Sequence, residues 1–249
     1  MAETWRLFTT WGAAPGFNMG LDEALLFARD APPTLRLYTW SPDTLSLGYF
    51  QALEDVPGAE RAGALVRRIT GGGAIHHRAE LTFSIAADLE HPLYRGPVAR
   101  SYERVHALIA RALARHGVAA VERGSRALAS DRAGTGMCFH ASSAQDLVWD
   151  ERKGVGSAQR RKDGRVLHHG SIKLGSTPLE GDIATLERLG LHVAPEELGR
   201  DLEDVFAEAL GARLVHGVPG TQERAAAVAL GARYVDPAFV RARRPRAQD

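Results

Sequence analysis

The chain has 249 residues, 45% of them hydrophobic, and its 31 basic and 30 acidic side chains leave a formal net charge of +1. This composition excludes an intrinsically disordered chain, and the near-zero charge argues against a protein that mainly coats nucleic acid or an anionic membrane. No window approaches the roughly 20 apolar residues of a membrane span, and residues 1–10 lack the apolar segment of a signal peptide. We therefore expect a globular cytoplasmic protein with one large domain or two small ones.

In chain order, apolar and alternating runs predict several strands and one helix in the first third of the chain. The helix is expected to begin at Asn18 as its N-cap, with Asp22 and Glu23 in its first turn, and to end before Pro32-Pro33. The predicted strands cover residues 5–10, 35–40, 44–49, 65–69 and 81–86.

Further along, apolar residues three and four apart predict a helix that begins near Ser101 and is stopped by Gly117. The periodicity is lost between Ser125 and Ser143, which predicts a long loop; long loops in compact domains are usually functional or disordered. The remaining predictions are strands at 146–149, 153–158 and 165–172, helices at 195–210 and 221–230, and a solvated end with Arg241, Arg243, Arg244 and Arg246.

Two residue types are scarce. Cys138 is the only cysteine, which excludes an internal disulfide and a multi-cysteine zinc site and weakly indicates a reducing compartment. The lysines are Lys153, Lys162 and Lys173, so 31 basic residues minus three leaves 28 arginines. A GC-rich genome alone explains such a bias.

A run of glycines follows the strand predicted at 65–69, in the sequence Arg67-Arg68-Ile69-Thr70-Gly71-Gly72-Gly73. Glycines let a ligand approach the backbone, and N–H groups beside two arginines suit a phosphate, a carboxylate or an acyl carbonyl. The run is not a Walker loop, because no Gly-Lys-Ser/Thr follows, and it lacks the G-x-G-x-x-G spacing. A plain glycine-rich hairpin turn is the alternative.

Two similar polar motifs, Gly156-Ser157-Ala158-Gln159 and His168-His169-Gly170-Ser171, lie on strands joined by the hairpin signal Lys162-Asp163-Gly164. Residues 153 and 157 share one face of a strand, so Lys153 and Ser157 are candidates for one pocket. The alternatives are a surface lysine and hydrogen-bonded structural histidines. A metal site from Cys138, His140 and His168 has no familiar ligand spacing, and we predict none.

Cys138 lies in the polar loop segment Gly136-Met137-Cys138-Phe139-His140. A free cysteine is most often a small buried hydrophobe. A reactive one needs a nearby cation or helix N-terminus that stabilises the thiolate. Lys153 and the Arg67-Arg68 pair are the candidate cations, and spacing alone does not place them near it.

Several segments together resemble the biotin/lipoate protein ligase superfamily, in its lipoate ligase and octanoyltransferase branch. They are Asn-Met-Gly-Leu-Asp-Glu-Ala-Leu-Leu (18–26), Leu-Ser-Leu-Gly-Tyr-Phe-Gln (45–51), the arginine–glycine run, Glu-Leu-Thr-Phe-Ser (80–84), Gly-Ser-Ala-Gln (156–159) and His-Gly-Ser-Ile (169–172). The resemblance implies an α/β (α+β) fold with a larger, mostly antiparallel sheet, a smaller sheet and flanking helices. It further implies a single catalytic domain over 1–249, without a separate C-terminal accessory domain.

The resemblance also implies functional residues. Lys153 matches a family lysine that contacts the reacting acyl carbonyl or a nucleotide phosphate. Cys138-Phe139 fits the position of a cysteine that, in one branch, accepts an octanoyl group. The residues implied to line the acyl or acyl-adenylate pocket are Arg67, Arg68, Gly71, Gly72, Gly73, Ala74, His76, Gly156, Ser157, Ala158, His169 and Gly170.

The sequence departs from the family pattern at three points. Arg78 stands where an acidic residue follows the family's histidine, which puts part of substrate recognition in question. His168 replaces a usual glutamine, and the segment after Phe139 lacks a proline common in the cysteine-dependent branch.

The leading hypothesis is therefore an octanoyltransferase that needs no cofactor. It moves an octanoyl group from acyl carrier protein, through Cys138, to a lysine of a lipoyl domain or of the glycine-cleavage H protein, without nucleic acid or membrane partners. The first alternative is a lipoate-protein ligase that uses ATP and Mg²⁺ and needs no cysteine. The second, motivated by Arg78, is a non-catalytic protein that binds acylated carrier domains.

Overall fold

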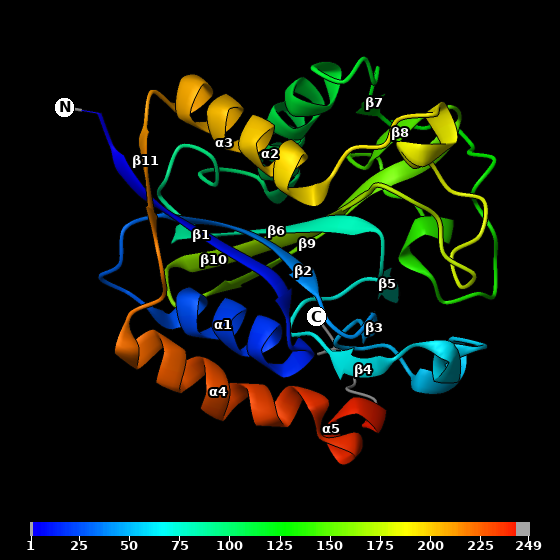
Figure 1. The fold of residues 1–249 in the computed structure, drawn as a ribbon, viewed down its shortest axis with the longest axis horizontal. Coiled ribbons are helices and arrows are strands. Elements are labelled where there is room, and N and C mark those ends of the chain that lie inside the picture. Colours follow the sequence, from blue (N-terminus) through cyan, green and yellow to red (C-terminus); the bar gives the residue numbers. More distant parts are fainter. Residues whose placement is uncertain (1, 243–249) are drawn as a thin grey trace.

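Two β-sheets form the frame of the molecule, and the larger one runs through its middle (Figure 1). This computed structural model describes residues 2–242, so Arg243, Arg244 and Arg246 of the expected solvated end lie outside the described residues. The larger sheet has the strand order β11-β1-β2-β6-β10-β9-β8-β7. Its strands are β1 (Thr4–Ala13), β2 (Thr34–Trp40), β6 (Glu80–Asp88), β7 (Val121–Glu122), β8 (Leu147–Trp149), β9 (Arg152–Lys162), β10 (Arg165–Lys173) and β11 (Arg213–Gly217).

Most neighbours in this larger sheet are antiparallel; the exceptions are β1 with β2 and β1 with β11. The smaller sheet has the order β4-β3-β5, with parallel pairing of β3 and β4 and antiparallel pairing of β3 and β5. Its strands are β3 (Thr44–Leu47), β4 (Ala64–Arg67) and β5 (Ile75–His77). The fold class predicted from the sequence is confirmed.

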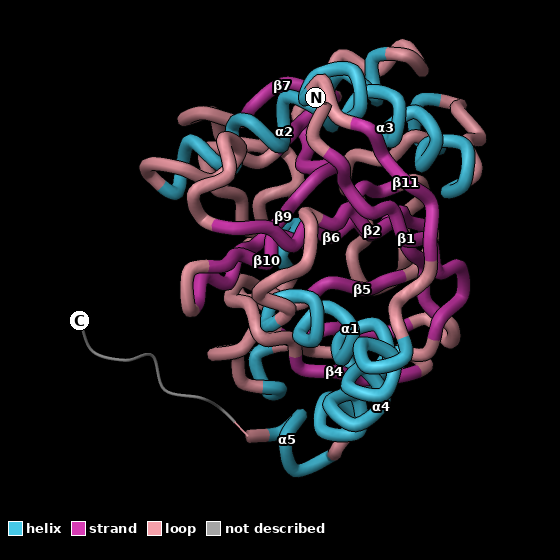
Figure 2. Tube along the Cα trace, turned by 90° about the vertical axis from the view of Figure 1, so that its left-hand side faces the viewer, coloured by secondary structure: helices cyan, strands magenta, loops and turns pink. Residues whose placement is uncertain are grey.

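Helices cover both faces of the larger sheet, with α2 and α3 on one side and α1 and α4 on the other (Figures 1 and 2). Val105 of α2 and Leu202 of α3 join the main core with strand residues such as Phe83, whereas Leu21 of α1 packs with Phe8 and with Ala227 of α4. The helices are α1 (Pro15–Phe27), α2 (Val98–Ala114), α3 (Pro195–Leu210), α4 (Thr221–Val235) and α5 (Pro237–Arg241).

The predicted start of the first helix is wrong. The helix α1 begins at Pro15, whose fixed φ suits a first helical position, and Asn18 lies inside it. The Asn18 amide donates to the carbonyl of Ala13 at 3.4 Å and to that of Thr39 at 3.2 Å. Its polar group therefore ties α1 to the end of β2, and Asp22 is buried one turn further on.

Three other elements differ from the sequence analysis near the end of the described chain, and one of them, the helix α5, was not predicted. The strand β11 was not predicted, because its residues are mostly exposed and show no alternation; it pairs in parallel with β1 at the sheet edge. The helix α4 continues past the predicted end at 230 to Val235. It is held there by close packing on α1.

Glycines bring the backbones of α1 and α4 into contact. A Cβ on Gly231 would lie 2.6 Å from the carbonyl oxygen of Gly16, and one on Gly20 would lie 2.0 Å from that of Ala227. Both distances are shorter than van der Waals contact, so only glycine fits without a shift of one helix.

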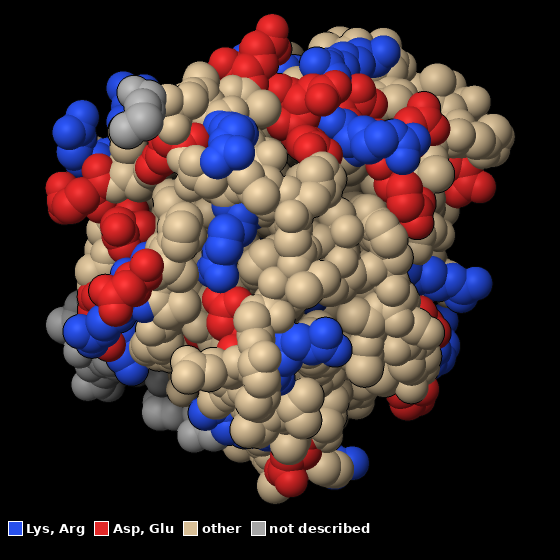
Figure 3. Space-filling model, turned by 60° about the vertical axis from the view of Figure 1, so that its left-hand side comes forward, with Lys and Arg blue, Asp and Glu red and all other residues tan. Residues whose placement is uncertain are grey.

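On the face shown in Figure 3, basic and acidic side chains alternate around the margin and the centre is mostly uncharged. Ion pairs such as those of Arg115 with Asp201 and Asp204 join α2 to α3. Within residues 2–242 no helix is long and apolar enough to cross a membrane.

Because of the α1–α4 contact, we expect that replacing a helical glycine by alanine lowers the free energy of unfolding instead of raising it. Gly231→Ala raises helix propensity by about 1 kcal/mol, yet we expect a net loss of about 1–3 kcal/mol in the free energy of unfolding because the new methyl overpacks the contact. Urea unfolding measures it. The control is Val228→Ala on the same helix, where the side chain is 66% exposed and the change stays within about 0.5 kcal/mol. A more stable Gly231→Ala variant would contradict the contact.

Candidate active site

The glycine run and the long loop meet at Cys138. The N–H of Ala74 donates to the carbonyl of Gly136, and the N–H of Cys138 donates to the carbonyl of Ala74, both at 2.8 Å. A Cβ on Gly73 would lie 2.8 Å from the Cys138 nitrogen, so glycine permits this approach. Cys138 then starts a short 3₁₀ turn, Cys138–His140, within the otherwise irregular loop predicted from the sequence.

Lys153 lies at the start of β9 with its ammonium directed at Cys138. Its Nζ is 3.4 Å from Cys138 Sγ and 2.9 Å from the carbonyl oxygen of the same residue. Asp146 Oδ2 pairs with it at 2.8 Å, and the lysine side chain is 2% exposed. Burial alone lowers the pKa of Lys153, but the charges of Cys138 and Asp146 outweigh it and the pKa is raised. The ammonium therefore stays charged at neutral pH.

The Arg68 side chain is hydrogen-bonded to the glycine run. Its Nη2 donates to the carbonyls of Gly71 and Gly73 at 2.7 and 2.8 Å, its Nη1 to the Ser46 carbonyl at 2.9 Å, and its Nε to the Thr70 hydroxyl at 3.2 Å. Burial lowers the pKa of Arg68 to about 10, which leaves the guanidinium charged at neutral pH. The guanidinium thus fixes the conformation of the glycine run, whose backbone faces the cavity between the two sheets.

Arg67 is used in a different way. Its guanidinium donates to the carbonyls of Gly48 and Gln51 at 2.8 and 2.6 Å and to that of Val240 on α5 at 2.5 Å. It joins β4 to the segment after β3 and to the last helix. The structure therefore places Arg67 within the scaffold, away from the cavity described next.

A narrow cavity lies between the two sheets and reaches Cys138. Its free volume is about 30 Å³, room for little more than a water molecule, so an acyl chain enters only if the lining shifts. Of the sequence-predicted residues, Arg68, Gly71, Gly72, Cys138, Ser157, Ala158, His169 and Gly170 line it. The residues that sequence reasoning missed are Met19, Tyr38, Trp40, Ser46, Ile75, His77 and Thr82.

His77, rather than the predicted His76, forms a wall of this cavity. Its ring stacks on Trp40 with centroids 4.1 Å apart. His76 turns the other way, and its Nε2 lies 2.8 Å from Asp43 Oδ2. Neighbouring residues of a strand point to opposite faces, so only one of these two histidines can line the cavity. Arg78, which departs from the family pattern, lies exposed in the turn that follows.

A buried polar cluster supports His169 from behind. Nδ1 of His169 is 2.9 Å from Asp22 Oδ2, and Nε2 of His169 is 2.6 Å from the Thr70 hydroxyl. Asp22 also pairs with Arg36 at 3.0 Å and accepts from the Tyr38 hydroxyl. Burial raises the pKa of Asp22, but the bonds from His169 and Arg36 outweigh it and the pKa is lowered. The carboxylate fixes the His169 ring.

The positions of Lys153 and Ser157 on one strand suggested a shared pocket, but the Ser157 hydroxyl does not contact Lys153. It contacts His106 Nε2 at 2.7 Å and His168 Nε2 at 2.9 Å. Because His106 belongs to α2, the hydroxyl points to the helix side of the sheet. Burial lowers the pKa of both histidines, so they are neutral at pH 7. His168 is thus completely buried and hydrogen-bonded on this side of the sheet.

An open groove of about 1510 Å³ runs beside the Cys138 turn. Its lining includes the buried Met137 and His140, and also Gly72, which it shares with the cavity. The exposed charged residues Glu54, Asp55, Asp131 and Arg132 also line the groove. Among residues 2–242 no group of three His, Cys, Asp or Glu side chains is placed to hold a metal ion.

A family model for the lipoyl protein ligase A/B catalytic domain matches residues 14–193. The chain belongs to this family. An octanoyltransferase LipM from Moorella thermoacetica is 44% identical over 188 residues, 73% of this chain and 68% of that protein. One from Kyrpidia tusciae is 35% identical over 267 residues, 94% of this chain and 97% of that protein. These relatives confirm the prediction of an acyltransferase.

Solved structures of the family share the fold. A putative lipoate protein ligase from T. acidophilum with bound lipoic acid superposes with a TM-score of 0.77, covering 97% of this chain and 99% of that one. A lipoate-protein ligase A bound with ATP gives 0.73, covering 93% and 95%. Both are 21% identical to this chain, which shows the fold alone.

Three further residues of this family member escaped the sequence analysis, because residue spacing does not show which side chains meet in the fold. Asp146 was visible as an acidic residue on a predicted strand, and Asp22 was assigned to a helix start. His106 was hidden among the apolar positions of α2. Only the fold brings them to Lys153, His169 and Ser157.

The Asp22 cluster predicts a pH-dependent stability. The pKa of Asp22 is lowered in the fold from 3.8, so its contribution is present above that pH and is lost as the pH falls through the folded value. Asp22→Asn should cost about 3–5 kcal/mol at pH 7, and the gap to wild type should narrow below about pH 4. Urea unfolding at several pH values measures this, with Asp30→Asn, an exposed acid, as control. A gap that does not change with pH contradicts the assignment.

Proposed function

We propose that this acyltransferase moves an octanoyl group from acyl carrier protein, through a thioester on Cys138, to a lysine of a lipoyl domain or of the glycine-cleavage H protein. The observation that carries the proposal is the Lys153 ammonium 3.4 Å from Cys138 Sγ, at the end of a cavity between the sheets. A neighbouring cation stabilises the thiolate, which is the nucleophilic form.

The first step is thioester exchange. The Cys138 thiolate attacks the carbonyl carbon of the octanoyl thioester, the bond from Sγ to that carbon forms, and the carrier's thiolate leaves. Negative charge develops on the carbonyl oxygen in between. Lys153 and backbone N–H groups of the glycine run are the donors we assign to it.

The second step is aminolysis. The neutral amine of the acceptor lysine attacks the acyl-cysteine, an amide forms, and the Cys138 thiolate leaves. The proton that the nitrogen loses passes to solvent or to the departing sulfur. Lys153 is already protonated, since Asp146 and Cys138 raise its pKa, so it acts as an electrostatic stabiliser. The overall exchange of a thioester for an amide needs no ATP.

The cavity and the scaffold have separate roles in this proposal. Trp40, His77, Met19 and Ala158 provide apolar walls for the acyl chain, and Arg68 keeps the glycine backbone in place. We also propose that residues 1–249 act as one catalytic domain, because α3 shares the core with α2 and β11 extends the main sheet.

The acyl-enzyme is the first testable consequence. Octanoyl-carrier protein without ATP should add one octanoyl group to Cys138, seen by intact-protein mass spectrometry and peptide mapping. Cys138→Ala should take no label and transfer nothing to H protein. Retention of full transfer activity by Cys138→Ala, together with ATP-dependent use of free lipoate, would establish the ligase alternative. Carrier binding without turnover under either condition would establish the non-catalytic binder.

Lys153 gives a second consequence. Lys153→Met should reduce kcat for octanoyl transfer by on the order of 10²–10³, because the oxyanion and the thiolate lose their cation. The variant also leaves Asp146 buried without its partner, which destabilises the fold. The matched control is Lys153→Met with Asp146→Asn, which removes that charge. We expect the double variant to regain stability while its kcat stays as low as that of Lys153→Met; a kcat restored to the wild-type value would argue against Lys153 in catalysis.

A further inference from the structure

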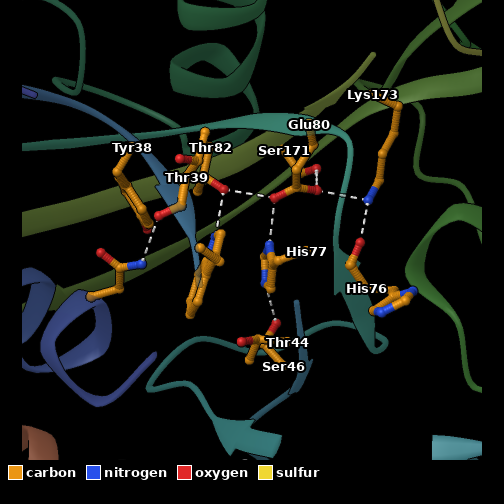
Figure 4. A network of polar contacts seen from close by, with 12 residues as sticks. Tyr38, Thr39, Thr44, Ser46, His76, His77, Glu80, Thr82, Ser171 and Lys173 are labelled. Carbon is orange, nitrogen blue, oxygen red and sulfur yellow. Dashed lines mark hydrogen bonds and ion pairs between the residues drawn. The ribbon is translucent and has the colours of Figure 1, made fainter. Parts of the chain in front are cut away.

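Lys173 is a fully buried lysine outside the cavity, and Figure 4 shows it at one end of a polar network. Its Nζ contacts Glu80 Oε2 at 2.7 Å, Glu180 Oε2 at 2.9 Å and the carbonyl of His76 at 2.8 Å. The sequence analysis assigned no role to this lysine. Burying an ammonium group without partners would strongly destabilise the fold. The two carboxylate partners of Lys173 therefore indicate that the residue has a specific role.

The charges around Lys173 depend on it. Burial raises the pKa of Glu80, but Lys173 and His77 outweigh it and the pKa is lowered. Glu180 keeps a raised pKa, because burial outweighs the attraction of the same lysine. Without the ammonium, two carboxyl groups would share a dry site, so one lysine holds both side chains in place.

The first path from Lys173 to Cys138 passes through Phe139. This ring is completely buried, and its centroid lies 4.8 Å from Lys173 Nζ and 5.4 Å from Lys153 Nζ. Cations near an aromatic ring are attracted to its π-electrons. The residue next to Cys138 is therefore in contact with two buried ammonium groups.

The second path passes through His140. Its Nε2 lies 2.6 Å from the main-chain carbonyl of Glu180, and its Nδ1 lies 2.9 Å from the Thr135 hydroxyl. The same Glu180 binds Lys173 through its side chain and receives the His76 N–H at 3.3 Å. All three residues of the Cys138–His140 turn thus contact a buried cation or a residue bound to one.

The third path leads to the cavity wall. Glu80 Oε1 accepts from His77 Nδ1 at 2.5 Å and from the Thr82 hydroxyl at 2.6 Å (Figure 4). The Thr82 hydroxyl oxygen in turn accepts from Trp40 Nε1 at 2.9 Å. His77 and Trp40 are the stacked pair of the wall. One ammonium therefore connects the wall of the cavity with the turn that carries Cys138.

We infer that Lys173 is a positioning residue for Cys138: its ammonium, through Phe139 and Glu180, sets the Cys138–His140 turn in register with the cavity wall held by Glu80. The inference rests on the proposed function only in taking Cys138 as the nucleophile. Lys173 itself contacts no reacting atom.

The test separates positioning from stability with three variants. Lys173→Met removes the ammonium. Lys173→Met with Glu180→Gln also removes the unbalanced carboxylate. Lys162→Met makes the same chemical change at an exposed lysine of the β9–β10 hairpin and serves as control. Each is measured for thermal midpoint, for kcat and KM in octanoyl transfer, and for the rate of Cys138 alkylation by iodoacetamide per folded molecule.

We expect Lys173→Met to lower the thermal midpoint and the double variant to recover much of it. Both should lose about 10- to 100-fold in kcat, with KM for the octanoyl donor within about threefold, and both should show altered alkylation rates. Lys162→Met should match wild type. Recovery of kcat together with stability in the double variant would make Lys173 a purely structural residue and overturn the inference, as would wild-type kcat and alkylation in Lys173→Met.

Alkylation keeps this result distinct from the proposed function. Iodoacetamide reports the reactivity of Cys138 whether or not octanoyl transfer occurs. If Cys138→Ala retains transfer, the proposed function fails, and kcat no longer reports on Cys138. The alkylation rates of the Lys173 variants then decide the inference alone: unchanged rates overturn it.

Discussion

A buried cation must be surrounded by acceptors and opposite charges, and this constraint organises the region around Cys138. Lys153, Lys173 and Arg68 are all at most 3% exposed, and each is bound to carboxylates, carbonyls or both. Taking these charges out of water is costly unless every partner is in place. The loops that supply the partners are therefore fixed wherever the cations are, and the Cys138 turn is one of them.

The two sheets and the glycine run make this arrangement possible. Strands β6, β9 and β10 are neighbours, so Glu80, Lys153 and Lys173 project from one rigid frame. The Cys138 loop has little regular structure of its own, and its backbone bonds to Ala74 only because Gly73 leaves room. An irregular segment is in this way held against regular strands, as the proposed role of Cys138 requires.

The sequence analysis was most successful where a periodic pattern is strong. The central strands and the helices on both faces follow from alternating and three-to-four spacings, which reflect burial on one side of an element. It failed where a polar residue had more than one possible partner. Asn18 is a good cap by type but binds a distant carbonyl, that of Thr39. Arg67 resembles an anion-binding residue but binds backbone oxygens of two segments, residues 48–51 and α5. His76 and His77 differ by one position, and the pleat of β5 decided between them.

The sequence by itself determined the fold class, the family and the two residues, Cys138 and Lys153, on which the proposed chemistry depends, because motifs and hydrophobic periodicity are local properties of the chain. Only the tertiary structure decided which charges are paired. Asp146 meets Lys153 at neighbouring strands, and Lys173 meets both Glu180, in the loop after its own strand, and the distant Glu80. Electrostatic pairing depends on distance and burial in space, and no spacing along the chain records either quantity.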